Sequence, residues 1–77
     1  MKHDILMVIR QKLFEDHVVS FRLYNALYKI TLSEHSVSIH QVGLDVCYSY
    51  SSLKDLFSEY IVYGDKLIDV IGDIKLS

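Results

Sequence analysis

Two groups of polar side chains have the types and spacing to bind a partner. The first group alternates with apolar residues in predicted strands, and it consists of Arg22, Tyr24, Lys29, Thr31, Ser38 and His40. Arginine, tyrosine and hydroxyl groups are typical of protein interfaces, although an ordinary solvated sheet face has the same composition. The candidate interaction surface on this face consists of Arg22, Tyr24, Lys29 and His40.

The second group is acidic and lies near the end of the sequence. Asp65, Asp69 and Asp73 follow one another at intervals of four, which would place them along one ridge of a continuous helix. Like charges at this spacing destabilise a helix by a few tenths of a kcal/mol, so a basic partner would relieve them. A plain solvated face is the other interpretation of the same pattern.

Residues suited to catalysis or metal binding do not form a recognised pattern. The histidines, His3, His17, His35 and His40, lack the spacing of two metal ligands one helical turn apart. Cys47 could pair with a distant histidine as nucleophile and base, but a cysteine in a strand more often acts as a small hydrophobe. We therefore expect no catalytic residue, no metal site and no cofactor, and so no enzyme.

Composition narrows the class of protein further. Residues 1–77 are enough for one small domain, and an apolar fraction of 51% favours burial of some surface between two copies. A single cysteine fits a reducing cytoplasm. The net charge of −2, with no basic stripe, argues against nucleic-acid binding, and no apolar run is long enough to span a membrane.

The elements that must position these residues begin with a predicted helix over residues 4–16, capped by Asp4. Met7 and Phe14 fall together on a face away from its core stripe, so either neighbouring chain covers them or they form an interface. Period-two alternation then predicts strands over residues 19–24, 28–33, 37–40 and a short fourth over 44–50. Asn25-Ala26 is the predicted turn of the first hairpin, and Gly43 marks a bulge or turn.

A second helix is predicted to begin after Ser52, which can cap it, and to stop at Gly64. Asp65 would then cap a short helical turn that ends at Gly72. The sequence thus predicts an α+β fold: an N-terminal helix, a three- to four-stranded antiparallel meander, and a C-terminal helix plus a short helical turn, as a two-layer sandwich. The same order occurs in double-stranded RNA-binding domains, but the second helix lacks their lysine cluster.

The segment YSYSSLKDLFSEYIVYGDKLIDVIGDI, Tyr48 to Ile74, resembles short uncharacterised proteins of Gram-positive bacteria and their phages. The resemblance implies an origin and a fold, and it carries no functional residues across. The helix-meander-helix order is also similar to some small phage proteins that block host nucleases. We therefore expect a non-enzymatic, cytoplasmic protein that binds another protein or itself. The alternative is a phage-derived inhibitor of a host nucleic-acid-processing enzyme that uses the Asp65, Asp69 and Asp73 ridge.

Overall fold

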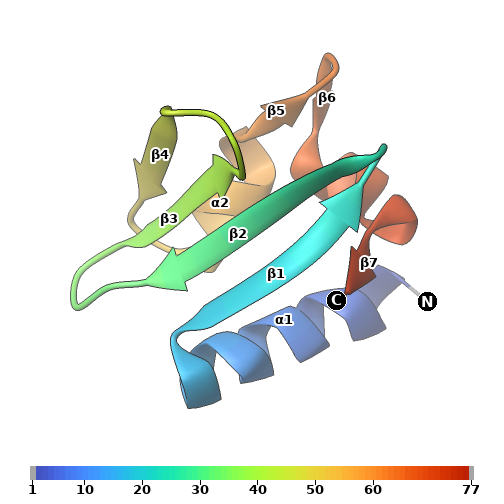
Figure 1. The fold of residues 1–77 in the computed structure, drawn as a ribbon. Coiled ribbons are helices and arrows are strands. Elements are labelled where there is room, and N and C mark those ends of the chain that lie inside the picture. The colour runs from blue at the N-terminus through green and yellow to red at the C-terminus, as the bar shows by residue number, and fades with distance from the viewer. Residues whose placement is uncertain (1, 77) are drawn as a thin grey trace.

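The computed structural model describes residues 2–76, and the side chains of residues 5–76. The chain forms an α+β fold built from two α-helices, a five-stranded antiparallel sheet, a two-stranded hairpin and a 3-10 helix (Figure 1). The elements are, in chain order, α1 (Lys2–Asp16), β1 (Val18–Leu23), β2 (Ala26–Leu32), β3 (Val37–Gln41), β4 (Cys47–Tyr50), α2 (Leu53–Glu59), β5 (Ile61–Val62), β6 (Asp65–Lys66), η1 (Leu67–Asp73) and β7 (Lys75–Leu76).

The main sheet contains the predicted meander and one strand more. Its strand order is β4-β3-β2-β1-β7, and each neighbouring pair is antiparallel. The fourth strand forms, but it covers only Cys47–Tyr50 of the predicted 44–50. At the opposite edge of the sheet, β7 pairs with β1 through Leu76 and Lys75, where the sequence predicts no strand.

One face of this sheet is buried, as its alternating pattern predicts. The buried residues of β1, β2 and β3 on this inner face are Val19, Phe21, Leu23, Tyr28, Ile30, Val37 and Ile39. Helix α1 contacts β1 and β2, whereas α2 contacts β3 and β4, and η1 contacts both helices. In Figure 1 the sheet lies in front of α2. The structure agrees with the expected two-layer sandwich only in part. The helices pack on one face of an antiparallel sheet, but the C-terminal region contains a hairpin and a 3-10 helix that the sequence does not predict.

Helix α1 places its apolar stripe on the core. Ile9 and Leu13 are buried, and Ile5 and Leu6 pack against the same cluster. The helix begins at Lys2, so Asp4 lies inside its first turn rather than at the predicted cap, and the Asp4 side chain is outside the described residues. The helix therefore begins two to three residues earlier than predicted.

The hairpin between β1 and β2 turns one residue earlier than predicted. Leu23 pairs with Ala26, so Tyr24-Asn25 forms the two-residue loop in place of Asn25-Ala26. Tyr24 has φ 52° and Asn25 has φ 66°, the double left-handed conformation of a type I′ turn. Asparagine tolerates this conformation well because its short side chain bonds locally, whereas alanine does not.

The C-terminal region departs most from the sequence prediction. Helix α2 begins as expected, with Ser52 Oγ accepting a 3.1 Å hydrogen bond from the Asp55 amide. It ends at Glu59, and β5 and β6 pair across Tyr63-Gly64, with φ of 51° and 86°. Gly64 thus serves a type I′ hairpin turn and not a helix C-cap, since both positions of such a turn need positive φ.

The final helical segment is also different from the prediction. Asp65 lies in β6 rather than capping a helical turn, and the chain becomes a 3-10 helix only at Leu67. This helix is kinked at Val70 and continues through Gly72 to Asp73. Leu67, Val70 and Ile71 are buried, so apolar burial against the two helices decides its position. Within residues 2–76, no helix is long and apolar enough to cross a membrane.

Candidate binding surface

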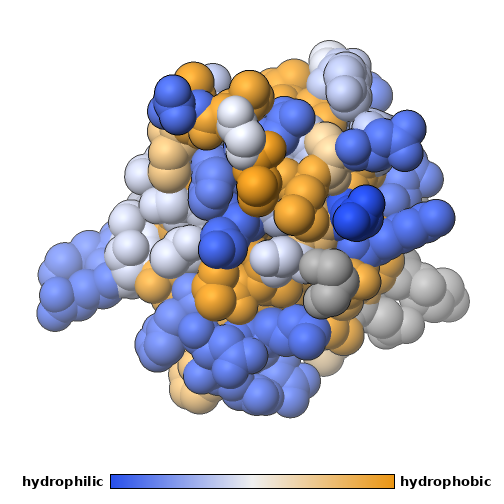
Figure 2. All heavy atoms as spheres, viewed as in Figure 1, coloured by the Kyte–Doolittle hydropathy of each residue, from blue (hydrophilic) through white to orange (hydrophobic). Residues whose placement is uncertain are grey.

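The outer face of the five-stranded sheet, opposite the core, is the candidate binding surface. Its members are Val18, Ser20, Arg22, Leu27, Lys29, Thr31, Ser38, His40, Cys47, Ser49 and Lys75, as the strand register requires. Figure 2, seen from the same side as Figure 1, shows hydrophilic and hydrophobic side chains mixed over this area. We call this set the outer sheet face. It contains Arg22, Lys29 and His40 of the predicted interaction surface.

The basic side chains of this face come together through the strand register. Arg22 of β1 is directly opposite Lys75 of β7, and Lys29 of β2 is directly opposite His40 of β3. Arg22 is opposite Leu27, so Lys29 lies on the diagonal from Arg22, a separation of about 7–8 Å between Cα atoms in such sheets. The three cations and the imidazole therefore form one row across β7, β1, β2 and β3. We call Lys75, Arg22, Lys29 and His40 the basic row.

The strands of the sheet supply no acidic partner for this row. None of the five strands contains an aspartate or a glutamate. Arg22, Lys29 and Lys75 are exposed, and none of them forms an ion pair within 4.0 Å in the part of the chain whose side chains are described. The sequence has no basic stripe when read linearly, yet the fold assembles a small basic surface. A negatively charged group is the chemistry that this surface can bind.

Tyr24 is the one predicted member that leaves the outer sheet face. It lies in the β1–β2 turn, where its hydroxyl donates a 2.9 Å hydrogen bond to Oδ2 of Asp73. Its ring also contacts that of Tyr63, with 5.6 Å between ring centroids. The hydrogen bond to Asp73 raises the pKa of Tyr24, and partial desolvation and the charges of Asp73 and Asp65 raise it further. Tyr24 therefore links the sheet to the C-terminal region.

A shallow hollow adjoins this link at the end of the basic row. Its volume is about 380 Å³, and it is lined by Arg22, Leu23, Tyr24, Asn25, Asp73 and Lys75. Asp73 contributes one carboxylate to the hollow, and that carboxylate accepts the hydrogen bond of Tyr24. The two cations of the hollow make no ion pair with it. A further anionic group can therefore reach Arg22 and Lys75 from solvent.

The predicted acidic ridge does not form. Asp65 lies in β6, whereas Asp69 and Asp73 lie in η1. In a 3-10 helix of three residues per turn, positions four apart are about 120° from each other, and the helix is also kinked at Val70 between them. The ridge required one continuous α-helix, and the β5–β6 hairpin interrupts it.

The strand register places Cys47 directly opposite His40 near the β4 edge of the sheet. Cys47 is a free, exposed thiol and not the half-buried hydrophobe that a strand position suggests. Within residues 5–76, no three histidine, cysteine, aspartate or glutamate side chains are grouped so as to hold a metal ion. The pair thus brings a thiol and an imidazole onto the outer sheet face without a third metal ligand.

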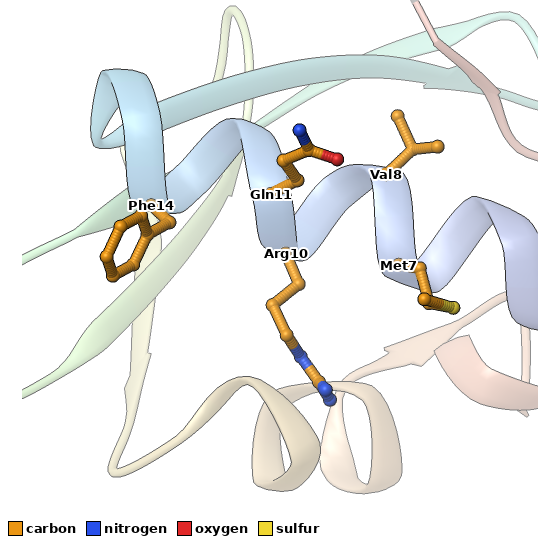
Figure 3. Close-up of a pocket in the computed structure, with 5 residues that line it drawn as sticks. All are labelled: Met7, Val8, Arg10, Gln11 and Phe14. Atoms are coloured by element: carbon orange, nitrogen blue, oxygen red, sulfur yellow. The ribbon is translucent and has the colours of Figure 1, made fainter.

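A second exposed surface lies on α1. Met7 is 66% exposed and Phe14 is 82% exposed. The interpretation that the neighbouring chain covers these two side chains is therefore wrong. Figure 3 shows Met7, Val8 and Phe14 projecting from the helix, with Arg10 extending toward α2. These three side chains, with Arg10 and Gln11, line an open groove of about 570 Å³. We call it the α1 groove.

Tyrosines cluster on the inner side of the sheet beneath β3 and β4. Tyr60 contacts the ring of Tyr28 at 6.3 Å and that of Tyr48 at 5.6 Å between centroids, both edge to face. Burial raises the pKa of Tyr60 to about 12, and the neighbouring tyrosines Tyr28, Tyr48 and Tyr50 add to the effect. Desolvation likewise raises the pKa of Tyr50 and of Tyr28. This cluster packs the edge of the core.

Sequence reasoning missed Lys75, although it completes the basic row. Lys75 stands between Ile74 and Leu76 in a two-residue alternation, which is too short to identify a strand. The only signal was that the apolar residues Ile74 and Leu76 alternate with Lys75.

Comparisons with protein-family models, with curated proteins and with solved structures found no match for this chain.

Proposed function

We propose that this protein is a small non-enzymatic binding module that engages a protein partner through the outer sheet face. The observation that carries the proposal is the basic row. Arg22, Lys29 and Lys75 are exposed on one face, they lack acidic neighbours in the sheet, and they make no ion pair with a side chain of residues 5–76. Hydroxyl groups of Thr31, Ser38 and Ser49 lie along one side of the row, and Ser38 and Ser49 already bond across strands at 3.2 Å. Arginine is enriched in protein interfaces relative to the rest of the protein surface.

Affinity capture with matched variants tests this proposal. The wild-type chain and the R22Q/K29Q variant would be used as baits for extracts of the source cell, with K12Q/K54Q as the control. The control removes the same number of cations from exposed positions on the two helices. We expect a protein retained by the wild type and the control to be lost with R22Q/K29Q. Equal retention by both variants would contradict the proposal.

A homodimer through the α1 groove is a second candidate within the same class. The exposure of Met7 and Phe14 favours it, because large apolar side chains grouped on one helix face are typical of subunit contacts. Light scattering after size exclusion measures the mass directly. A mass near 9.0 kDa at high protein concentration would exclude the dimer. A dimer that is retained in M7S/F14S would place the contact elsewhere.

The alternative from the sequence, an inhibitor of a host nucleic-acid-processing enzyme, depended on the acidic ridge. The described residues do not form that ridge, since Asp65 lies in a hairpin and Asp69 in a separate 3-10 helix. No observation on the described residues therefore favours this alternative over a protein-binding module.

A further inference from the structure

We propose that the partner group recognised by the basic row is an acidic protein segment, whose carboxylates pair with Arg22, Lys75 and Lys29. This inference rests on the proposed function, since it assigns the chemistry of the partner to the surface proposed there. It commits to a polypeptide ligand with clustered aspartate or glutamate. The following paragraphs give the observations behind that choice.

The first observation is the direct opposition of two cations. Arg22 and Lys75 are Cα partners on adjacent antiparallel strands and point to the same face. Like charges at opposed positions destabilise a sheet, and no ion pair in the described residues relieves this one. A carboxylate placed between them would offset the repulsion. Arginine suits this role because its planar guanidinium can donate two parallel hydrogen bonds to one carboxylate.

The second observation is that the five strands of the sheet carry no aspartate or glutamate that would repel an acidic ligand. The carboxylate of Asp73 lines the adjoining hollow together with Arg22 and Lys75, and its Oδ2 accepts the Tyr24 hydrogen bond. Lys29 lies diagonally from Arg22 toward β3, on the side away from β7. The ligand can therefore extend from the hollow across β1 and β2, with successive acidic groups meeting Lys75, Arg22 and Lys29.

The third observation favours a protein ligand over a nucleic acid. Sequence-tolerant binding of single strands uses aromatic rings on which bases stack. The outer sheet face contains no aromatic residue, because Phe21, Tyr28 and Tyr48 all lie on the inner face. Tyr24 lines the adjoining hollow, where its ring already contacts Tyr63 and its hydroxyl bonds to Asp73. Binding to duplex nucleic acid would rely on phosphate contacts alone, and three cations provide few of these.

A titration of the isotope-labelled full chain tests the inference. The probe is a peptide of eight glutamates, followed by amide chemical shifts, with a Gly-Ser peptide of equal length as the neutral control. We expect shifts in β1, β2 and β7 and none in the α1 groove. We expect R22Q/K75Q to weaken the binding by about tenfold or more, and K12Q/K54Q by less than about twofold. An increase of ionic strength from about 0.02 M to about 0.2 M should weaken it several-fold, because exposed charges are screened.

A second variant guards against a folding defect in R22Q/K75Q. R22K keeps the charge but loses the paired hydrogen bonds, so we expect it to bind more tightly than R22Q/K75Q and more weakly than the wild type. Absence of shifts with the glutamate peptide would overturn the inference. Equal binding by R22Q/K75Q and the wild type would also overturn it. Tighter binding of an eight-nucleotide oligo(dT) at the same face would replace the acidic segment with a nucleic acid.

Failure of the acidic-segment inference and failure of the proposed function give different experimental results. If capture of a partner depends on Arg22 and Lys29 while the glutamate peptide does not bind, the outer sheet face is a binding surface for another chemistry. If the peptide binds this face but no captured protein depends on it, the proposed function fails and only the anion-binding property of the basic row stands.

Discussion

The Tyr24 hydroxyl donates a 2.9 Å hydrogen bond to Oδ2 of Asp73, and the two residues are 49 positions apart. This bond joins the first hairpin turn to the end of η1, immediately before β7 enters the sheet. It therefore lies beside the strand pair that aligns Lys75 with Arg22. The position of the last cation of the basic row depends on a contact between distant parts of the chain.

The D73N substitution should lower the pKa of Tyr24. The hydrogen bond to the carboxylate and its negative charge both raise that pKa, and an amide has no charge. The pKa can be followed by nuclear magnetic resonance of labelled tyrosine rings as the pH is raised. The D69N substitution is the control, because Asp69 is not among the groups that raise this pKa. Equal shifts in both variants would show that the hydrogen bond does not govern the ionisation of Tyr24.

Stability should fall at high pH in a way that depends on Tyr60. Its pKa is about 12 in the folded protein, whereas an unfolded tyrosine ionises near pH 10. Since the folded state holds this proton more tightly, the contribution of Tyr60 is fully present below about pH 10 and is lost toward about pH 12. The Y60F variant should lose less stability than the wild type between about pH 9 and about pH 11, measured by urea unfolding. A loss equal to that of the wild type would assign the effect to other groups.

Truncation of Phe21 should cost far more stability than truncation of Phe14. Phe21 is 0% exposed and stacks on Tyr28 at 5.4 Å, so F21A should cost about 3–5 kcal/mol. A small domain has roughly 5 kcal/mol of stability in total, so this variant should be largely unfolded by circular dichroism. Phe14 is exposed, and F14A should change stability by less than about 0.5 kcal/mol. Similar losses in both variants would contradict the placement of the core.

Loss of the Ser52 cap should destabilise α2. Its Oγ accepts the amide of Asp55, and removal of such a cap costs about 1 kcal/mol. S52A should therefore lower the urea midpoint, whereas S58A, at an exposed position within the same helix, should leave it within about 0.5 kcal/mol. Ser51 also bonds to the Asp55 carboxylate at 2.6 Å, so S51A tests whether that second contact adds to the cap. A midpoint unchanged in S52A would rule out the cap as a source of stability.

The parts of the fold with strong periodicity could be predicted from the sequence. Alternating apolar residues identify which side chains of β1, β2 and β3 face the core. The same alternation correctly placed Arg22, Lys29 and His40 together on the opposite face. Ser52 was identified as a cap because serine followed three residues later by an acidic residue is a local signal.

Other parts of the fold could not be predicted, because the same local sequence signal fits two different local structures. Gly64 has positive φ in either a helix C-cap or a type I′ turn, and the choice is made by β5 pairing with β6, which no local pattern specifies. The same hairpin is the reason that the predicted ridge of Asp65, Asp69 and Asp73 does not form. Lys75 was missed because β7 is only two residues long and gains its place by pairing with β1, a contact across most of the chain.

The lack of acidic residues in the sheet also makes the molecule electrically asymmetric. With a net charge of −2 and three cations on the outer sheet face, the rest of the chain carries five excess negative charges. Such a separation gives the protein a dipole moment that can turn it in the field of a charged partner before any contact is made. The outer sheet face would thus be presented first to an acidic surface. The encounter rate, and not only the affinity, should then fall as salt is added.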